Sequence, residues 1–371
     1  MNVVGNANRL VFMDLLRAYA VLMMVQGHTI EVFLKSEYRT LDNYFFNIWN
    51  FNRGLTAPIF LFSTGLVFNF LFTKYDTSFF ANPRLLKGIK RAVFLLCITL
   101  VFRYPGLKLS KYAGLSFDGW KQFLAVDVLQ LIAVSLLIVI ILNYIAGLFN
   151  KAYLPVFMFA AFAILFSSRS VYNITWSDTM PVVIAAFINN NTGSQFPLFP
   201  WLFYVLCGAV FGTILHRYRS PEKLRRLIRY CLAGAIFIIL PIGAAEAIFA
   251  YGFGITFLWV TPALDIFRMG FVLFAVSLFI YVSLVWKEIP QVITWAGRNS
   301  LWIYLLHTII LYGSTYNEGF STYYRERYEA VPSIFFAMLM LIAMMLFVYI
   351  KEKGTLLFKE GVSALPLARK S

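Results

Sequence analysis

Charged residues are scarce in this sequence. Aspartate, glutamate, lysine and arginine together make up 13% of the 371 residues, which is about half of what a soluble domain carries. Hydrophobic residues make up 60%, and the mean hydropathy is +0.74. A soluble domain of this size has far fewer apolar runs, so no soluble globular fold fits this composition.

Several chemical signatures are missing as well. The three cysteines, Cys97, Cys207 and Cys231, lie in or beside apolar segments and have no paired spacing, which argues against a disulfide framework or a zinc site. The sequence contains no glycine loop for phosphate, no serine nucleophile elbow and no cluster of metal-ligating residues. We therefore expect a protein that works without a bound metal.

Long apolar runs are what the sequence has in abundance. About 20 apolar residues cross the hydrocarbon core as a helix, and ten such spans are predicted: 10–33, 57–73, 88–103, 123–149, 152–167, 198–215, 227–247, 267–286, 290–313 and 333–350. Two other apolar stretches, Pro181–Ile188 and Gly254–Leu264, are too short to cross. The predicted fold is all-α: a polytopic integral membrane helix bundle of about ten transmembrane helices, with a single domain over residues 1–371.

The first span is expected to stay in the mature protein. It contains Asp14 and Arg17, and no small-residue cleavage site follows it, so it reads as a membrane anchor and not as a removable signal peptide. We expect a multi-pass protein of a bacterial inner membrane.

The formal net charge of +15 is better explained by the orientation of the chain in the membrane than by binding of nucleic acid. Lysine and arginine are clustered between apolar runs, which disfavours nucleic acid as a partner. If the N-terminus is cytoplasmic and ten spans alternate, the inner segments hold 19 basic residues and the outer segments hold 11. By the positive-inside rule, both termini are predicted to be cytoplasmic.

The first span also holds the densest set of polar residues: Asp14, Arg17, Gln26 and His28. A charge in mid-membrane costs about 2.5–3.5 kcal/mol on insertion scales, so each one needs a reason. Asp14 and Arg17 are neighbours on a helix face, and His28 shares that face about 16 Å further along the axis. A buried ion pair that fixes helix packing, with His28 at the outer interface, explains these residues about as well as a functional site does.

Polar residues in other spans favour the functional interpretation. Asp127 and Gln130 share a face near the outer end of the fourth span, and His307 lies in the outer half of the ninth, which begins near Arg298. Asn69 interrupts the second span. Each residue alone is more simply a packing feature. Together with the first span, they predict a polar cavity through the bundle.

These residues and their order resemble the transmembrane acyltransferase superfamily, which includes acyltransferase family three and the heparan-α-glucosaminide N-acetyltransferase group. The first-helix signature is Asp14-x-x-Arg17 followed by Arg17-x10-His28. The other matching segments are RGLTAPIFLFSTG (Arg53–Gly65), DVLQLIA (Asp127–Ala133), FPLFPWLFYVLCGAVFG (Phe196–Gly212) and GRNSLWIYLLH (Gly297–His307). The resemblance covers about residues 9–313.

The resemblance implies transfer of an acyl group, usually acetyl from acetyl-CoA on the cytoplasmic side, to a sugar or glycan on the other side, as in modification of cell-envelope polysaccharides. Arg17 would bind the donor, with Arg298 as a second candidate. His28 would act as general base or carry the acyl group itself. Asp127 would orient His28 or accept a proton, and Asp14, Gln130 and His307 would have structural or orienting roles.

One departure limits the comparison with the heparan enzyme. Its active-site histidine lies in the loop before the second helix, and the matching stretch here, NIWNFNRGLTAP, contains no histidine. The acceptor of that enzyme therefore cannot be transferred to this chain.

Two other functions are compatible with polar residues inside a bundle. A multi-pass transporter or lipid-linked sugar flippase would need them too, although the sequence has no paired half-repeats. A non-catalytic scaffold would not explain why Asp14, Arg17 and His28 form a charged stripe along one face of the first span. The expected partners are a glycan or sugar acceptor and membrane lipids, and homo-oligomerisation is left open.

Overall fold

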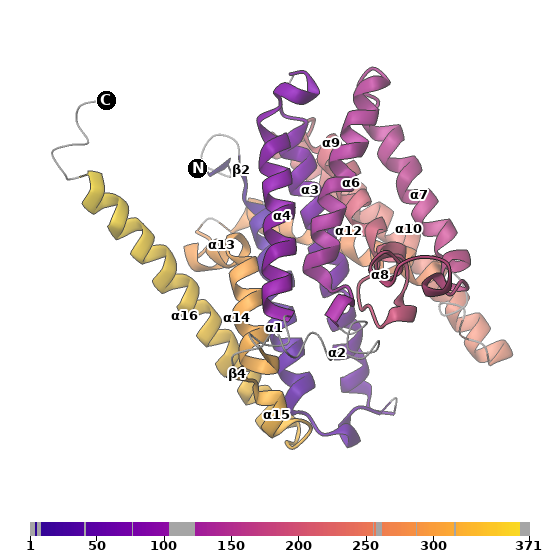
Figure 1. Ribbon diagram of the computed structural model, residues 1–371, viewed down its shortest axis with the longest axis vertical. Coiled ribbons are helices and arrows are strands. Elements are labelled where there is room, and N and C mark those ends of the chain that lie inside the picture. Colours follow the sequence, from indigo (N-terminus) through magenta and orange to yellow (C-terminus); the bar gives the residue numbers. More distant parts are fainter. Residues whose placement is uncertain are drawn as a thin grey trace. The chain divides into compact units, whose positions relative to one another are not determined.

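The computed structural model describes residues 4–5, 9–40, 42–75, 77–103, 123–254, 256, 262–286, 288–314 and 317–363. Helices dominate this part of the chain (Figure 1). Its strands form two short antiparallel pairs: β1 (Val4–Gly5) with β2 (Arg9–Leu10), and β3 (Gly313–Ser314) with β4 (Asn317–Glu318). The predicted all-α class is confirmed.

The chain divides into two compact units. Unit 1 comprises Met1–Thr56 and Val282–Ser371, and unit 2 comprises Ala57–Tyr281. The helices of unit 1 are α1 (Val11–Phe33), α2 (Tyr44–Gly54), α13 (Gln291–Arg298), α14 (Ser300–Tyr312), α15 (Phe320–Tyr324) and α16 (Ala330–Ser363). The helices of unit 2 are α3 (Thr56–Phe72), α4 (Pro83–Arg103), α6 (Val128–Leu148), α7 (Tyr153–Tyr172), α8 (Val182–Ile188), α9 (Leu198–Leu215), α10 (Pro221–Phe253) and α12 (Ala263–Val285). A single domain over residues 1–371 stays a prediction.

Nine of the ten predicted spans each coincide with one helix of the described chain. Seven helical segments of the described chain are long and apolar enough to cross a membrane, and α14 is a shorter apolar helix. The third and fifth predicted spans, 88–103 and 152–167, belong to the longer helices α4 and α7. The protein is thus an integral multi-pass membrane protein, whereas the number of crossings and the side of each terminus stay predictions.

The ninth predicted span, 290–313, was wrong as a single helix, because it breaks into α13 and α14 at Asn299. The Asn299 amide nitrogen donates to the carbonyl of Trp295 at 2.9 Å and to Glu352 Oε1 at 2.7 Å. Lys351 Nζ donates to Asn299 Oδ1 at 2.7 Å. These bonds hold the break against α16.

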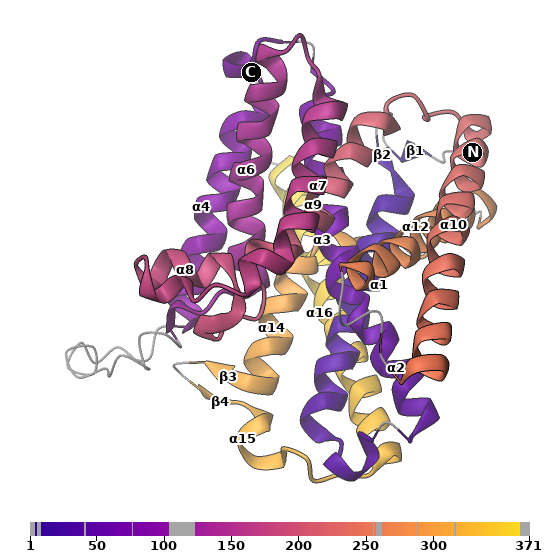
Figure 2. The same ribbon diagram turned by 90° about the vertical axis from the view of Figure 1, so that its right-hand side faces the viewer.

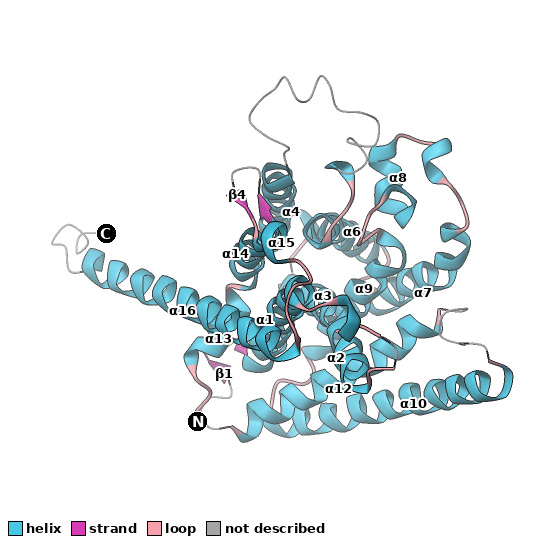
Figure 3. Cartoon of the chain, turned by 90° about the horizontal axis from the view of Figure 1, so that it is seen from below, coloured by secondary structure: helices cyan, strands magenta, loops and turns pink. Residues whose placement is uncertain are grey.

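Unit 1 is built around α1. This helix packs most extensively against α13, α16 and α14, and Figure 3 shows α13 and α16 beside it. Fully buried Val21 and Val25 of α1 lie in one apolar cluster with Ile303 of α14 and Val348 of α16. Because this apolar face is taken up by packing, the polar residues of α1 have a fixed orientation within the unit.

Unit 2 contains two closely packed helix pairs, α4 with α6 and α7 with α9 (Figure 2). The stretch Pro181–Ile188 forms the short helix α8, and most of Gly254–Leu264 lies outside the described residues. Asn69, which interrupts the second span in the sequence, is fully buried and donates to the Ala209 carbonyl and to Thr213 Oγ1. Asn143 donates in turn to Asn69 Oδ1. Asn69 therefore ties α3 to α6 and α9.

Glycines allow α3 and α9 to touch through their backbones. A Cβ on Gly208 would lie 2.0 Å from the Phe62 carbonyl oxygen, and one on Gly65 would lie 1.9 Å from the Val205 carbonyl oxygen. Small residues are what let membrane helices approach this closely.

Gly208→Ala should therefore force the two backbones apart and destabilise the protein by about 3 kcal/mol or more. The measurement is thermal unfolding of the detergent-purified protein, with the yield of monodisperse protein as a second readout. Gly147→Ala is the matched control, because a Cβ there meets nothing within 4 Å and Gly147 is the next-to-last residue of α6, so its melting temperature should stay close to that of the wild type. Equal melting temperatures for the two variants would contradict the close backbone contact.

Candidate functional site

The polar residues of α1 lie along one unbroken helix. Asp14 and Arg17 stand in its first two turns, and His28 and Glu31 stand in its last two. Since a helix rises 1.5 Å per residue, Arg17 and His28 are separated by about 16 Å along the axis. The stripe predicted from the sequence therefore has two separate ends, each with its own contacts inside unit 1.

At the N-terminal end, two predicted residues meet α13 and α14. Arg17 donates through Nη2 to Ser300 Oγ at 2.8 Å, and Arg298 Nε lies 3.5 Å from Asp14 Oδ2. The structure thus brings Asp14, Arg17 and Arg298 together at this end of α1, whereas their binding of an acyl donor stays a prediction. An ion pair between Asp14 and Arg17 themselves stays a prediction.

A glycine makes this approach of α13 to α1 possible. A Cβ on Gly297 would lie 2.1 Å from the carbonyl oxygen of Asp14, so the two backbones are in direct contact. Ser300, the first residue of α14, is completely buried beside Arg17. The N-terminus of α14, where backbone N–H groups are not used within the helix, therefore lies next to a guanidinium group.

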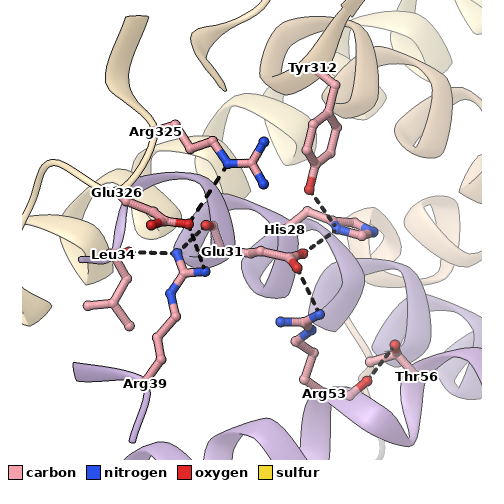
Figure 4. Close-up of polar contacts among 9 residues, drawn as sticks. All are labelled: His28, Glu31, Leu34, Arg39, Arg53, Thr56, Tyr312, Arg325 and Glu326. Atoms are coloured by element: carbon pink, nitrogen blue, oxygen red, sulfur yellow. Dashed lines mark hydrogen bonds and ion pairs between the residues drawn. The ribbon is translucent and has the colours of Figure 1, made fainter. Parts of the chain in front are cut away.

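At the C-terminal end, His28 lies between a carboxylate and a phenol (Figure 4). Its Nδ1 is 3.4 Å from Glu31 Oε2 and 3.0 Å from the hydroxyl of Tyr312 on α14. Either contact fixes one tautomer of the neutral ring: Nδ1–H donates to Glu31, because a carboxylate can only accept hydrogen bonds, or Nδ1 accepts from the Tyr312 hydroxyl. The first tautomer leaves the lone pair on Nε2, and the His28 side chain is 32% exposed.

Glu31 also binds a residue from another helix. Arg53 of α2 donates through Nη2 to Glu31 Oε1 at 3.1 Å, so each carboxylate oxygen faces a different partner. The aliphatic part of Arg53 passes directly over Gly27, where an added Cβ would lie 3.0 Å from Arg53 Cγ. Only glycine leaves that passage open without displacing Arg53.

Sequence reasoning missed Glu31, Arg53 and Tyr312 as site residues. Glu31 could have been found, because residues three apart on a helix are neighbours and His28 is three residues before it. Arg53 and Tyr312 give no such signal, since only the packing of α2 and α14 on α1 brings them near His28.

His307 is stacked on His28, with ring centroids 5.7 Å apart and an interplanar angle of 24°. It is completely buried, and its Nδ1 lies 2.7 Å from the Ile303 carbonyl oxygen. A carbonyl can only accept, so Nδ1 carries the proton. Its Nε2 is buried without a hydrogen-bond partner, which is a costly arrangement that needs an explanation.

The other predicted residues have different surroundings. Asp127 belongs to unit 2, where it caps α6: its side chain accepts from Leu129 N, and Gln130 accepts from Asp127 N, both at 2.8 Å. The catalytic role of Asp127 and the role of Gln130 at a site stay predictions.

The arrangement around His28 is suited to one kind of chemistry. An imidazole whose Nδ1–H is held by a carboxylate presents Nε2 as a base, the arrangement used for acyl transfer in many enzymes. No group of three His, Cys, Asp or Glu side chains in the described residues is placed to hold a metal ion.

Comparison with known proteins agrees with this chemistry. No curated protein and no solved structure matches the chain. The model of acyltransferase family 3, described as an acyltransferase domain, matches residues 10–352, a range that contains both ends of the α1 stripe and favours an acyltransferase over a transporter. By this match, which covers nearly the whole sequence, the chain belongs to acyltransferase family 3 and is a membrane acyltransferase.

Proposed function

We propose that this protein moves an acyl group, acetyl in the simplest case, from cytoplasmic acyl-CoA to a hydroxyl or amino group of a sugar or glycan on the extracytoplasmic side. The observation that carries this proposal is the cluster of His28, Glu31 and Tyr312 at the C-terminal end of α1. With a cytoplasmic N-terminus, that end of α1 faces away from the cytoplasm.

In the proposed reaction, Nε2 of His28 takes the proton of the acceptor group as that group attacks the thioester carbonyl. A new acyl–oxygen or acyl–nitrogen bond forms, the carbon–sulfur bond breaks, and the proton returns to the thiolate of coenzyme A. Glu31 keeps the Nδ1 proton in place and stabilises the imidazolium that forms in between. An acyl-histidine intermediate on Nε2 is the alternative, and the residues present serve either route.

The N-terminal end of the stripe is the proposed donor site. Coenzyme A carries phosphates, and the planar guanidinium of Arg17 binds phosphate or carbonyl oxygens through a fork of N–H donors. The adjacent N-terminus of α14 adds the positive end of a helix dipole, which favours an anion at that place. Arg298, 3.5 Å from Asp14, is the second cation there.

His28→Ala and Glu31→Gln test the transfer site. Loss of a positioned general base lowers rates by about 10²–10⁴-fold, so His28→Ala should reduce transfer to that extent. Glu31→Gln keeps the shape of the side chain but removes its charge, and a smaller loss of roughly tenfold or more is expected. The measurement is transfer of labelled acetyl from acetyl-CoA to the envelope glycan fraction by the purified, reconstituted protein.

His307→Leu is the control for this experiment. The change removes the unpartnered Nε2, which favours folding, and the Nδ1 bond to the Ile303 carbonyl, which opposes it, so the melting temperature should change little, with a smaller loss of activity than in His28→Ala. Wild-type turnover by a folded His28→Ala protein would remove His28 from the mechanism. A collapse of folding in His28→Ala would mean that its contacts serve packing.

Arg17→Lys tests the donor site. Lysine keeps the positive charge but lacks the planar fork, so the variant should fold normally and bind coenzyme A roughly tenfold more weakly. Isothermal titration of the detergent-purified protein with coenzyme A gives the affinity directly. Arg298→Lys is the matched comparison: unchanged affinity in Arg17→Lys together with a loss in Arg298→Lys would move the donor site to Arg298.

A further inference from the structure

A short segment after α15 is fastened to the end of α1. This segment, residues 325–328, is called the strap here. The N–H of Glu326 donates to the Val32 carbonyl at 2.8 Å, and the N–H of Tyr328 donates to the Phe33 carbonyl at 2.9 Å. These carbonyls have no partner within the helix, so the strap satisfies them and is held at the same end of α1 as His28.

The strap contains a strained residue. Glu326 has a φ of +58°, a left-handed conformation that costs free energy for a residue with a side chain. The two hydrogen bonds of the strap to α1 hold it in this conformation. Such residues gather at ligand clamps and active sites, and this one directly follows Arg325.

The charges around the strap do not balance. Glu326 Oε1 lies 3.6 Å from Arg39 Nη1 and 3.9 Å from Arg325 Nε, so one carboxylate oxygen serves two guanidinium groups. Glu31 pairs with Arg53. Among the residues in Figure 4, three guanidinium groups therefore face two carboxylates, and Arg325 is the most exposed of them, with 75% of its side chain accessible.

Arg325 extends toward the reactive histidine. In Figure 4 its guanidinium group points into the space bordered by the Tyr312 hydroxyl, the Glu31 carboxylate and His28. The Tyr312 hydroxyl itself lies 3.0 Å from His28 Nδ1. An anion bound by Arg325 would therefore lie beside the proposed place of transfer.

We propose that Arg325 binds a carboxylate or phosphate of the acyl acceptor, close to the group that receives the acyl chain, and that the acceptor is accordingly an acidic glycan. Guanidinium matches both anions as a planar fork of donors. This inference rests on the proposed function, because it takes His28 as the place of transfer.

Binding without the acyl donor tests the proposal separately from catalysis. The detergent-purified full-length protein is titrated with a uronic-acid trisaccharide and with its neutral methyl ester, and then with an oligosaccharide phosphomonoester and its dephosphorylated form. A charge-assisted hydrogen bond favours the charged member of a pair by roughly tenfold or more. We expect that preference for at least one pair, which also identifies the anion.

Arg325→Gln should abolish the preference. The matched control is Arg327→Gln, which removes the same charge from an exposed residue of the same strap and should retain it. Equal binding of charged and neutral ligands by the wild type, including no binding of either, would overturn the proposal. So would a preference that survives in Arg325→Gln or that disappears equally in Arg327→Gln.

A lipid headgroup is the other source of phosphate at this place. If Arg325→Gln changes only the binding of phosphatidylglycerol, measured in nanodiscs with phosphatidylcholine as the reference lipid, Arg325 is a lipid contact and the acceptor proposal fails. The binding experiment does not depend on catalysis. An inactive protein that still prefers the charged ligand would refute the proposed function but not the role of Arg325.

Discussion

The polar groups at the C-terminal end of α1 depend on one carboxylate, that of Glu31. One of its oxygens accepts from Arg53, and the other faces Nδ1 of His28. Because both His28 and Glu31 stand on the same rigid helix, their spacing needs no support from the rest of the fold. What the fold adds is Arg53, which keeps the carboxylate from being an uncompensated charge, and Tyr312, which borders the imidazole from α14.

The same helix organises the other end of the stripe, and glycine has a similar role at both ends. Gly297 lets α13 touch the backbone at Asp14, and Gly27 lets Arg53 cross α1 on its way to Glu31. At both ends of the stripe, a glycine therefore lets another segment come close enough for charged side chains to pair. The distance between the ends, about 16 Å along the axis, covers half of a hydrocarbon core of about 30 Å. In the proposed reaction one substrate therefore reaches into the bundle, and the extended pantetheine arm of acyl-CoA is suited to do so.

The helices could be predicted from the sequence because the length of an apolar run is a local property. The break at Asn299 could not, since it depends on Lys351 and Glu352, more than fifty residues away. At the site, His28, Arg17 and Arg298 stood out as polar groups in apolar surroundings, whereas Arg53 and Tyr312 become neighbours of His28 only through packing. Asp127 also stood out as a polar group in apolar surroundings, but a local pattern explains it. Asp127-x-x-Gln130 is a helix-capping sequence, and these residues form a capping box at the start of α6.

Sidedness is the most direct test of the account, since its central claim is that the acyl group passes from a donor at the Arg17 end to an acceptor at the His28 end. Sealed vesicles of known orientation are loaded with envelope glycan on one side, and labelled acetyl-CoA is added on the other. The account predicts labelled glycan only when acetyl-CoA is on the cytoplasmic side and glycan on the opposite side. Labelled glycan formed with donor and acceptor confined to the same side would contradict it.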